Sequence, residues 1–225
     1  MYKISTYYNE CNAELRHEDM VVNRPVVVYN ELIKILTPLG TPVEFKNGQR
    51  IPTNIKSERV LYIITEGYAS YRFFTSDNVI TYVFSPVIIG FMGFFDTLDT
   101  AFYRAETQVK TIKVELKKIE PLLDKDPELW RSIAELINFA FQRLILRDII
   151  LSRKTSYEII KNILMELSNQ PEFVRKKVTA AQYILDRLPI SRSQVMNLLS
   201  KLKSKKIIVT NRGCLVSIST FPDKL

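Results

Sequence analysis

The clearest alternation of apolar and polar residues lies near the C-terminus, in residues 178–208. A first short helix is predicted there, with one apolar face made of Tyr183, Ile184 and Leu188. Pro189 is expected to end it, and Ser191 stands where it can cap a second helix. In that second helix the apolar residues recur at helical spacing: Val195, Leu198, Leu199 and Leu202. This pattern predicts a helix-turn-helix, although alone it also fits an ordinary solvated helical hairpin.

The apolar stripe of the second helix leaves polar residues on the outside. These side chains can hydrogen-bond base edges or phosphates, as the exposed face of a recognition helix does: Arg192, Ser193, Gln194, Asn197 and Lys201. After Lys205 and Lys206 come two β-rich segments around Asn211-Arg212-Gly213, which is a hairpin-turn signal. The hairpin would form a wing beside the helices. Ser191 is a further predicted DNA contact, and Lys205, Lys206 and Arg212 are expected to contact phosphates.

Charge separates this end of the chain from the rest. Residues 151–225 hold 14 Lys and Arg against 5 Asp and Glu, a net charge of +9, whereas residues 1–150 hold 18 against 19, a net charge of −1. A basic region of this kind suits a polyanion. The charge therefore favours a winged helix-turn-helix over the solvated hairpin, with double-stranded DNA as the partner.

The middle of the chain has a different pattern of apolar and turn-forming residues. Residues 41–114 form short β-rich pieces separated by turn residues, which predicts an antiparallel sandwich or barrel. A short helix is expected before them at Asn30–Leu36. The many Phe and Tyr residues of this region could line a ligand pocket, but core packing is the preferred interpretation.

One long helix is predicted from Pro127 to about Lys154. An apolar stripe along it fits a coiled-coil seam between two copies of the chain: Trp130, Ile133, Ile137, Ala140, Leu144 and Leu151. A second stripe, which includes Leu136 and Phe139, must also be hidden. One stripe would pack on the β domain and the other on a second chain, giving a homodimer. The alternative is that both stripes pack within one chain.

Composition limits the classes of function. The chain is 225 residues long, is 46% hydrophobic, and has no apolar run long enough to span a bilayer and no signal-peptide pattern at its start, so we expect a cytoplasmic protein with no membrane partner. Cys11, Cys214 and His17 are too few and too scattered for a zinc site or an iron–sulfur cluster, and we expect no cofactor. A redox role for Cys11 stays open. We expect no enzyme, because no spacing joins a catalytic group to an activator.

The order of β region, long helix and winged helix resembles the cyclic-AMP receptor protein/FNR family of bacterial transcription regulators. The similarity covers residues 40–220 and rests on the segments VLYIITEGYASYRF, IIGFMGFF, YRAETQVKTIKVELKKI and PISRSQVMNLLSKLKSKKII. It implies an α+β fold with an N-terminal antiparallel β-roll like a cyclic-nucleotide-binding domain. By resemblance, Arg192, Ser193 and Asn197 take the family's base-reading positions, and Thr179 begins a helix at a phosphate contact.

The phosphate cassette of that family is degenerate here. Gly90-Phe91-Met92-Gly93 lacks the family's ribose-binding Glu, and Thr100-Ala101 replaces the Arg-Ser pair that binds the cyclic phosphate. Arg104 is a weak candidate to replace that pair. The degenerate cassette most resembles an enterobacterial branch linked to hydrogen peroxide resistance. We therefore expect no binding of cyclic nucleotides and leave open whether another small molecule binds.

These observations predict a β-roll domain with leading helices at residues 1–125, a dimerisation helix at 126–154 and a DNA-binding domain at 155–225. The predicted function is a homodimeric, sequence-specific transcription regulator, for which RNA polymerase is a further candidate partner. The rival hypothesis is a small-molecule sensor that signals through a protein partner. The operator, the regulated genes and the direction of regulation cannot be read from the sequence.

Overall fold

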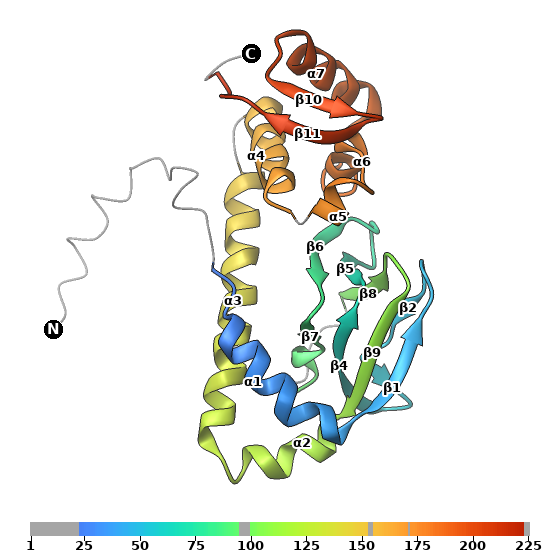
Figure 1. Ribbon diagram of the computed structural model, residues 1–225, viewed down its shortest axis with the longest axis vertical. Coiled ribbons are helices and arrows are strands. Elements are labelled where there is room, and N and C mark those ends of the chain that lie inside the picture. Colours follow the sequence, from blue (N-terminus) through green and yellow to red (C-terminus); the bar gives the residue numbers. More distant parts are fainter. Residues whose placement is uncertain (1–22, 95–99, 153–154, 171, 223–225) are drawn as a thin grey trace, which may run out of the picture.

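The computed structural model of the protein describes residues 23–94, 100–152, 155–170 and 172–222. A strand-rich N-terminal half, a long helix and a helical C-terminal domain with a small hairpin follow one another along the chain (Figure 1). The predicted α+β fold is therefore confirmed. Cys11 and His17 lie outside the described residues.

Two antiparallel sheets build the β-roll. The first has the order β1 (Thr41–Phe45), β9 (Val109–Glu115), β4 (Glu58–Glu66) and β3 (Asn54–Ile55), with β7 (Val87–Ile89) also paired to β4. The second has the order β2 (Arg50–Ile51), β8 (Ala101–Ala105), β5 (Tyr68–Phe73) and β6 (Val79–Phe84). The segment IIGFMGFF is only partly strand, because β7 is followed by the 3-10 helix η4 (Phe91–Phe94).

Helices close the roll at its N- and C-terminal ends. Helix α1 (Val26–Leu36) is followed by the 3-10 helix η3 (Thr37–Leu39), and α2 (Leu116–Leu123) continues directly from β9. Helix α1 begins four residues before the predicted start at Asn30. The run Val26–Val28 is β-branched and has low intrinsic helix propensity, so its sequence did not indicate a helix. It nevertheless extends a helix whose buried face is set by Tyr29, Leu32 and Leu36. Helix α2 was not predicted, because its first residues continue the pattern of apolar and polar residues of the preceding strand.

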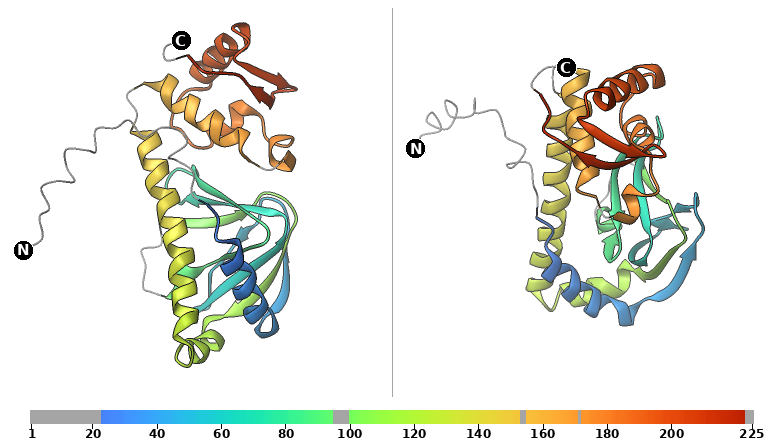
Figure 2. Two further views of the ribbon diagram at one scale, coloured as in Figure 1. Left: turned by 60° about the vertical axis from the view of Figure 1, so that its left-hand side comes forward. Right: turned by 45° about the horizontal axis from the view of Figure 1, so that its top comes forward.

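Helix α3 (Pro127–Leu151) runs along the roll and on to the C-terminal domain, as the two views of Figure 2 also show. Its start is fixed by Asp126, whose Oδ1 accepts a hydrogen bond of 3.0 Å from the backbone N–H of Glu128. At 25 residues it spans about 37 Å. No helix among the described residues is long and apolar enough to cross a membrane.

The C-terminal domain comprises α4 (Ser156–Ser168), α5 (Glu172–Arg175), α6 (Ala180–Leu185), α7 (Arg192–Ser204) and the hairpin of β10 (Ile208–Asn211) and β11 (Cys214–Ile218). The predicted helices and wing are confirmed. The end of α6 was placed too late: the helix stops at Leu185 and not at Pro189, because Asp186 caps it and the chain then turns towards α7.

Two hydrophobic cores hold the molecule together. The N-terminal core joins the interior of the roll to α1, α2 and the first half of α3, and its buried residues include Leu32, Leu61, Ile63, Val114 and Leu136. The C-terminal core joins α4, α6, α7 and the wing, and its buried residues include Ile163, Leu167, Ile184, Leu199 and Leu215. Tyr68, Val79 and Tyr82 of the β-roll belong to the C-terminal core, so the two halves of the chain share buried surface.

Candidate nucleic-acid interface

Helices α6 and α7 present a defined outer face because their inner faces are buried together. Tyr183 and Ile184 of α6 pack in the C-terminal core with Val195, Leu199 and Leu202 of α7. All five side chains are almost fully hidden from solvent. This packing fixes the rotation of α7 about its own axis and therefore decides which of its side chains face outward.

The start of α7 is held by a capping box. The Oγ of Ser191 accepts a hydrogen bond of 3.2 Å from the backbone N–H of Gln194, and the Oε1 of Gln194 accepts one of 3.2 Å from the backbone N–H of Ser191. The Oγ atoms of Ser191 and Ser193 lie 3.0 Å apart. These predicted contact residues thus already hydrogen-bond one another, and in the unbound protein they define where the helix begins.

The outermost ridge of α7 follows from its buried face. At about 100° per residue, the positions opposite that face are Ser193, Asn197, Ser200 and Ser204. By the same count Lys201 lies beside this ridge, whereas Arg192, at the first position of α7, lies about 60° from Val195 and thus nearer the buried face. The side chains of Arg192 and Asn197 are exposed and make no hydrogen bond or ion pair with the described residues. Their polar groups are thus available to a ligand.

The wing is anchored at the start of α6. The backbone N–H of Ala180 donates to the carbonyl of Gly213 over 2.9 Å, and the Oγ1 of Thr179 accepts from the backbone N–H of Gln182 over 3.1 Å. At the hairpin turn, Arg212 and Gly213 both have positive φ, 48° and 85°. A Cβ atom at Gly213 would lie only 3.1 Å from the Cγ2 of Thr179. Arg212, the residue before Gly213, is exposed at this turn.

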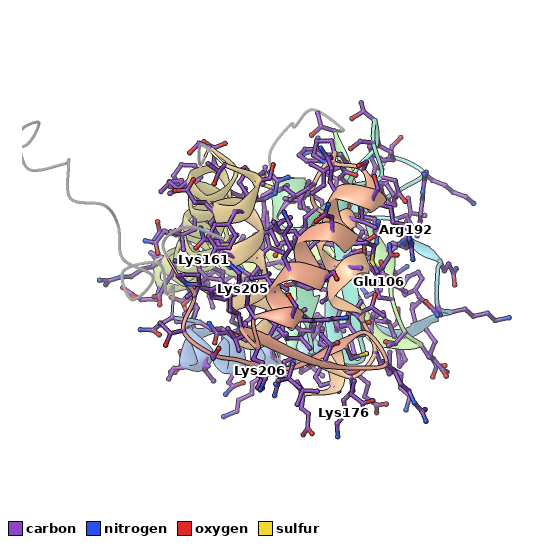
Figure 3. All side chains as sticks on the ribbon, turned by 90° about the horizontal axis from the view of Figure 1, so that it is seen from above. Glu106, Lys161, Lys176, Arg192, Lys205 and Lys206 are labelled. Atoms are coloured by element: carbon purple, nitrogen blue, oxygen red, sulfur yellow. The ribbon has the colours of Figure 1, made fainter. Side chains whose placement is uncertain are left out.

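Basic side chains surround the ridge. Figure 3 views the molecule from the side of the C-terminal domain, with Arg192 near the start of α7 and Lys205 beyond its end. Lys205 and Lys206 are exposed between α7 and β10. Lys161 of α4 and Lys176 after α5 are further basic residues of the C-terminal domain, labelled at the left and the bottom of this view. They were not predicted, although the basic run 175–177 was an available signal. Lys176 is paired with Glu172 at 2.7 Å.

A shallow groove runs between α7 and the start of α4. Gln194, Asn197 and Lys201 line one side of it, Ser156 and Ile160 line the other, and its volume is about 220 Å³. The polar residues predicted to contact DNA therefore stand along the edge of a continuous surface that also includes α4.

The predicted dimer seam is only partly exposed. Trp130 and Leu144 are 40% and 43% exposed, and Ala140 is exposed as well. Ile133, in contrast, is 1% exposed and belongs to the N-terminal core, and Ile137 and Leu151 pack against the cores of their own chain. Ile133 is thus unavailable to a second chain, because it is buried in the N-terminal core of its own chain.

The exposed apolar stripe of α3 includes residues that the heptad pattern missed. Phe141 and Ile145 are 58% and 42% exposed. Together with Trp130, Ala134 and Leu144, which are also exposed, they fall on one side of the helix. Large exposed apolar side chains in one line mark a surface that contacts another protein.

Arg104 does not face the interior of the β-roll. Its neighbour Tyr103 pairs across the strands with Tyr71 on the core side, and the two rings lie 4.6 Å apart. Because side chains alternate along a strand, Arg104 projects from the opposite face. There its guanidinium contacts Glu106 at 3.1 Å and Asp77 at 3.2 Å.

Comparison with known proteins agrees with this geometry. Residues 156–223 match the family described as winged helix-turn-helix DNA binding. The inhibitor of hydrogen peroxide resistance from Escherichia coli strain K12 is 28% identical over 207 residues, which cover 90% of this chain and 98% of that protein.

Solved structures show the same fold over most of the chain. The global regulator CLP of Xanthomonas campestris, described as c-di-GMP responsive, superposes with a TM-score of 0.69 at 18% identity, over 85% of this chain and 100% of that chain. A protein from Eubacterium rectale described as a crp/fnr-family transcriptional regulator superposes with a TM-score of 0.61 at 12% identity, over 83% of this chain and 88% of that chain. The chain therefore has the fold of the cyclic-AMP receptor protein/FNR regulators, with a winged helix-turn-helix domain at its C-terminus.

Proposed function

We propose that this protein is a sequence-specific, DNA-binding transcription regulator that acts as a homodimer in the cytoplasm. The observation that carries the proposal is the exposed polar surface of α7, with Asn197 on its outer ridge, Lys201 beside that ridge and Arg192 exposed at the first position of the helix. A helix of this kind fits the major groove, where Arg and Asn side chains can hydrogen-bond base edges. The exposed Met196 adds an apolar contact suited to a thymine methyl group.

Phosphate contacts would come from the periphery of the ridge. Thr179 and Arg212 stand where the wing meets α6, and Lys205 and Lys206 follow the end of α7. Lys205, Lys206 and Arg212 would neutralise phosphate charge and Thr179 would donate a hydrogen bond to a phosphate oxygen, none of them reading sequence. The net charge of +9 in residues 151–225 supports attraction that weakens with added salt.

Dimerisation would run through the exposed stripe of α3. Two such helices packed in a two-fold arrangement would bury Phe141, Leu144 and Ile145. The dimer would then place two copies of α7 about 34 Å apart, which matches one turn of DNA and a nearly palindromic site.

The β-roll in this proposal does not bind cyclic nucleotides. Its sequence has Thr100 and Ala101 where the family clamps the phosphate, and the ring pair of Tyr71 and Tyr103 occupies the core side of the second sheet. A cyclic phosphate buried there would need a guanidinium to replace its water shell, and Arg104 lies on the other face. The related inhibitors of hydrogen peroxide resistance suggest genes of the oxidant response as targets.

DNA bound by the protein in cells would test the proposal. Fragments recovered by genome-wide mapping, and random duplexes of the same length, are titrated with purified protein at several salt concentrations. We expect a shared nearly palindromic motif and binding of mapped fragments at salt concentrations that release random DNA. Equal affinity for both sets at every salt concentration would instead favour a sensor that acts through a protein partner.

A further inference from the structure

The outer face of the second sheet of the β-roll packs directly against the DNA-binding domain. On β5 the side chains of Tyr68, Ser70 and Arg72 alternate with those that face the N-terminal core. Tyr68 and its neighbours Val79 and Tyr82 on β6 are buried in the C-terminal core. The sheet therefore contributes one face to each core.

A single residue of the DNA-binding domain makes both polar contacts at the centre of this junction. The phenol of Tyr82 donates to the Oδ2 of Asp186 over 3.1 Å, and the backbone N–H of Val79 donates to the carbonyl of Asp186 over 2.6 Å. Asp186 is the C-cap of α6. The end of the first helix of the helix-turn-helix is thus attached to β6 by both its backbone and its side chain.

Arg187, the residue after Asp186, adds a buried positive charge to this contact. Arg187 is 6% exposed, and its guanidinium carbon lies 4.7 Å from the ring centre of Tyr82 and 3.5 Å from that of Tyr183. Those two rings stack at 5.8 Å, and Arg187 also pairs with Glu166 of α4 at 3.4 Å. A buried guanidinium needs all of these partners in place, so their arrangement is unusually sensitive to a change in any one of them.

The turn before β6, the strand that contacts Asp186, is itself held rigid by hydrogen bonds within the β-roll. Arg72, 3% exposed, donates to the carbonyl of Asp77 over 2.7 Å and to Glu106 over 3.0 Å, which ties down the turn that precedes Val79. At the rim of the junction, the ring of Phe173 lies 6.0 Å from that of Tyr68. Neither side of the contact can therefore shift without breaking hydrogen bonds or ring contacts.

The position of this junction matters for α7. Helix α6 shares its buried face with α7, so the orientation of α6 fixes that of the recognition helix. The covalent path from the long helix to α6 passes through α4, whereas the contact of Asp186 with β6 is a second, independent attachment. Two attachments define an orientation that one alone would leave free to rotate.

We propose that Tyr82, Asp186 and Arg187 form an interdomain clasp that holds the recognition helix at a fixed angle to the long helix, and that they are positioning residues for recognition of two DNA half-sites. This inference rests on the proposed function. The clasp fixes the orientation of the DNA-binding domain without a bound ligand. The protein therefore holds its recognition helix in the DNA-binding orientation before it meets its operator.

The test uses the full-length variant Tyr82→Phe, which removes one hydroxyl and keeps the ring. Hydrogen exchange at the Val79 amide, which donates to the carbonyl of Asp186, reports the clasp directly. We expect this exchange to accelerate roughly five- to tenfold when the hydrogen bond from Tyr82 to Asp186 is lost. Phe173→Ala, at the half-exposed rim, should act in the same direction. The matched control is Tyr157→Phe, which removes a phenol that donates to the carbonyl of Pro222 over 2.7 Å within the C-terminal domain.

DNA binding supplies the second measurement. The probes are a duplex with two half-sites, selected from random DNA by the unmodified protein, and a duplex with one half-site. We expect Tyr82→Phe to bind the two-half-site duplex roughly tenfold more weakly and the single half-site with unchanged affinity, because a loosened angle lowers the effective concentration of the second contact.

The outcomes separate the clasp from the proposed function. Unchanged Val79 exchange in both Tyr82→Phe and Phe173→Ala would overturn the clasp, and faster exchange with an unchanged ratio between the two duplexes would overturn its role in positioning. A protein that selects no duplex at all would contradict the proposed function, while the exchange measurement would still report on the clasp.

Discussion

Residues on α7 divide into those that shape the helix and those that face outward. Ser191 and Gln194 make the capping box, whereas Arg192 and Asn197 have their polar groups directed to solvent. The sequence predicted all of them as contact residues because the residue types of a cap and of a base-reading face overlap. Only the hydrogen-bond geometry distinguishes the two roles.

Arg192→Ala and Lys205→Ala should weaken DNA binding in different ways. Loss of a base contact at Arg192 should cost about 1–3 kcal/mol on the specific duplex and little on random DNA. Loss of a phosphate contact at Lys205 should weaken binding to all duplexes and reduce the slope of log affinity against log salt by about one. Titrations at several salt concentrations measure both effects, with the remote and exposed Lys125→Ala as control. An equal loss on specific and random DNA for Arg192→Ala would contradict base reading.

Buried tyrosines should limit stability at high pH. Burial raises the pKa of Tyr62 to about 12, and burial also raises the pKa values of Tyr82, Tyr103 and Tyr183. A phenol with a raised pKa keeps its proton in the folded protein, so the free energy of unfolding is unaffected below pH ~10 and falls between pH ~10 and 12, by about 3 kcal/mol for Tyr62 alone.

Absorbance of phenolate at 295 nm, followed together with circular dichroism, measures this effect. We expect the buried phenols of Tyr62, Tyr82 and Tyr183 to ionise only as the helical signal disappears. A smooth titration of every tyrosine near pH ~10, with the fold intact, would show that these phenols are accessible to water.

At the scale of elements, helix α3 carries the clearest difference between sequence and structure. The alternation of three and four residues predicted a coiled-coil seam through Ile133 and Ile137. Both stripes of this helix are apolar, and a sequence cannot tell which of them the β-roll covers. In the structure α1 and the roll cover Ile133, which leaves Phe141, Leu144 and Ile145 for a second chain.

The pair of changes Phe141→Glu and Leu144→Glu should convert the proposed dimer to folded monomers. Each would place a charge in an apolar interface without a partner, while the two positions are exposed in the single chain and leave its cores intact. Sedimentation velocity measures the result, and Gln142→Glu, exposed on the same helix but off the stripe, is the control. A double variant that still sediments as the parent would place the dimer contact elsewhere.

The capping box and the wing were predictable because their signals are local. Ser191 and Gln194 are three residues apart, and Asn211-Arg212-Gly213 is a short turn sequence. The clasp had no such signal, since Tyr82 and Asp186 are 104 residues apart and each is an ordinary residue in its own segment. The outward direction of Arg104 depends in the same way on strand register, which the sequence did not establish.

At the scale of the whole molecule, the β-roll acts as a scaffold in our proposal. Isothermal titration with cyclic AMP and cyclic GMP should show no binding at micromolar concentrations, because losing two charge-assisted hydrogen bonds at roughly 1.5–3 kcal/mol each weakens a micromolar site to about millimolar or worse. A dissociation constant below about 10 µM would contradict this expectation. So would binding that Arg104→Ala abolishes.

The shared C-terminal core has a consequence for how the protein melts. Three β-roll residues, Tyr68, Val79 and Tyr82, are buried only because the helices of the C-terminal domain cover them. Neither half can therefore unfold without exposing the apolar surface of the other. A calorimetric scan should accordingly give one cooperative heat-absorption peak in place of two, and the C-terminal 70 residues or so, expressed alone, should be far less soluble than the intact chain.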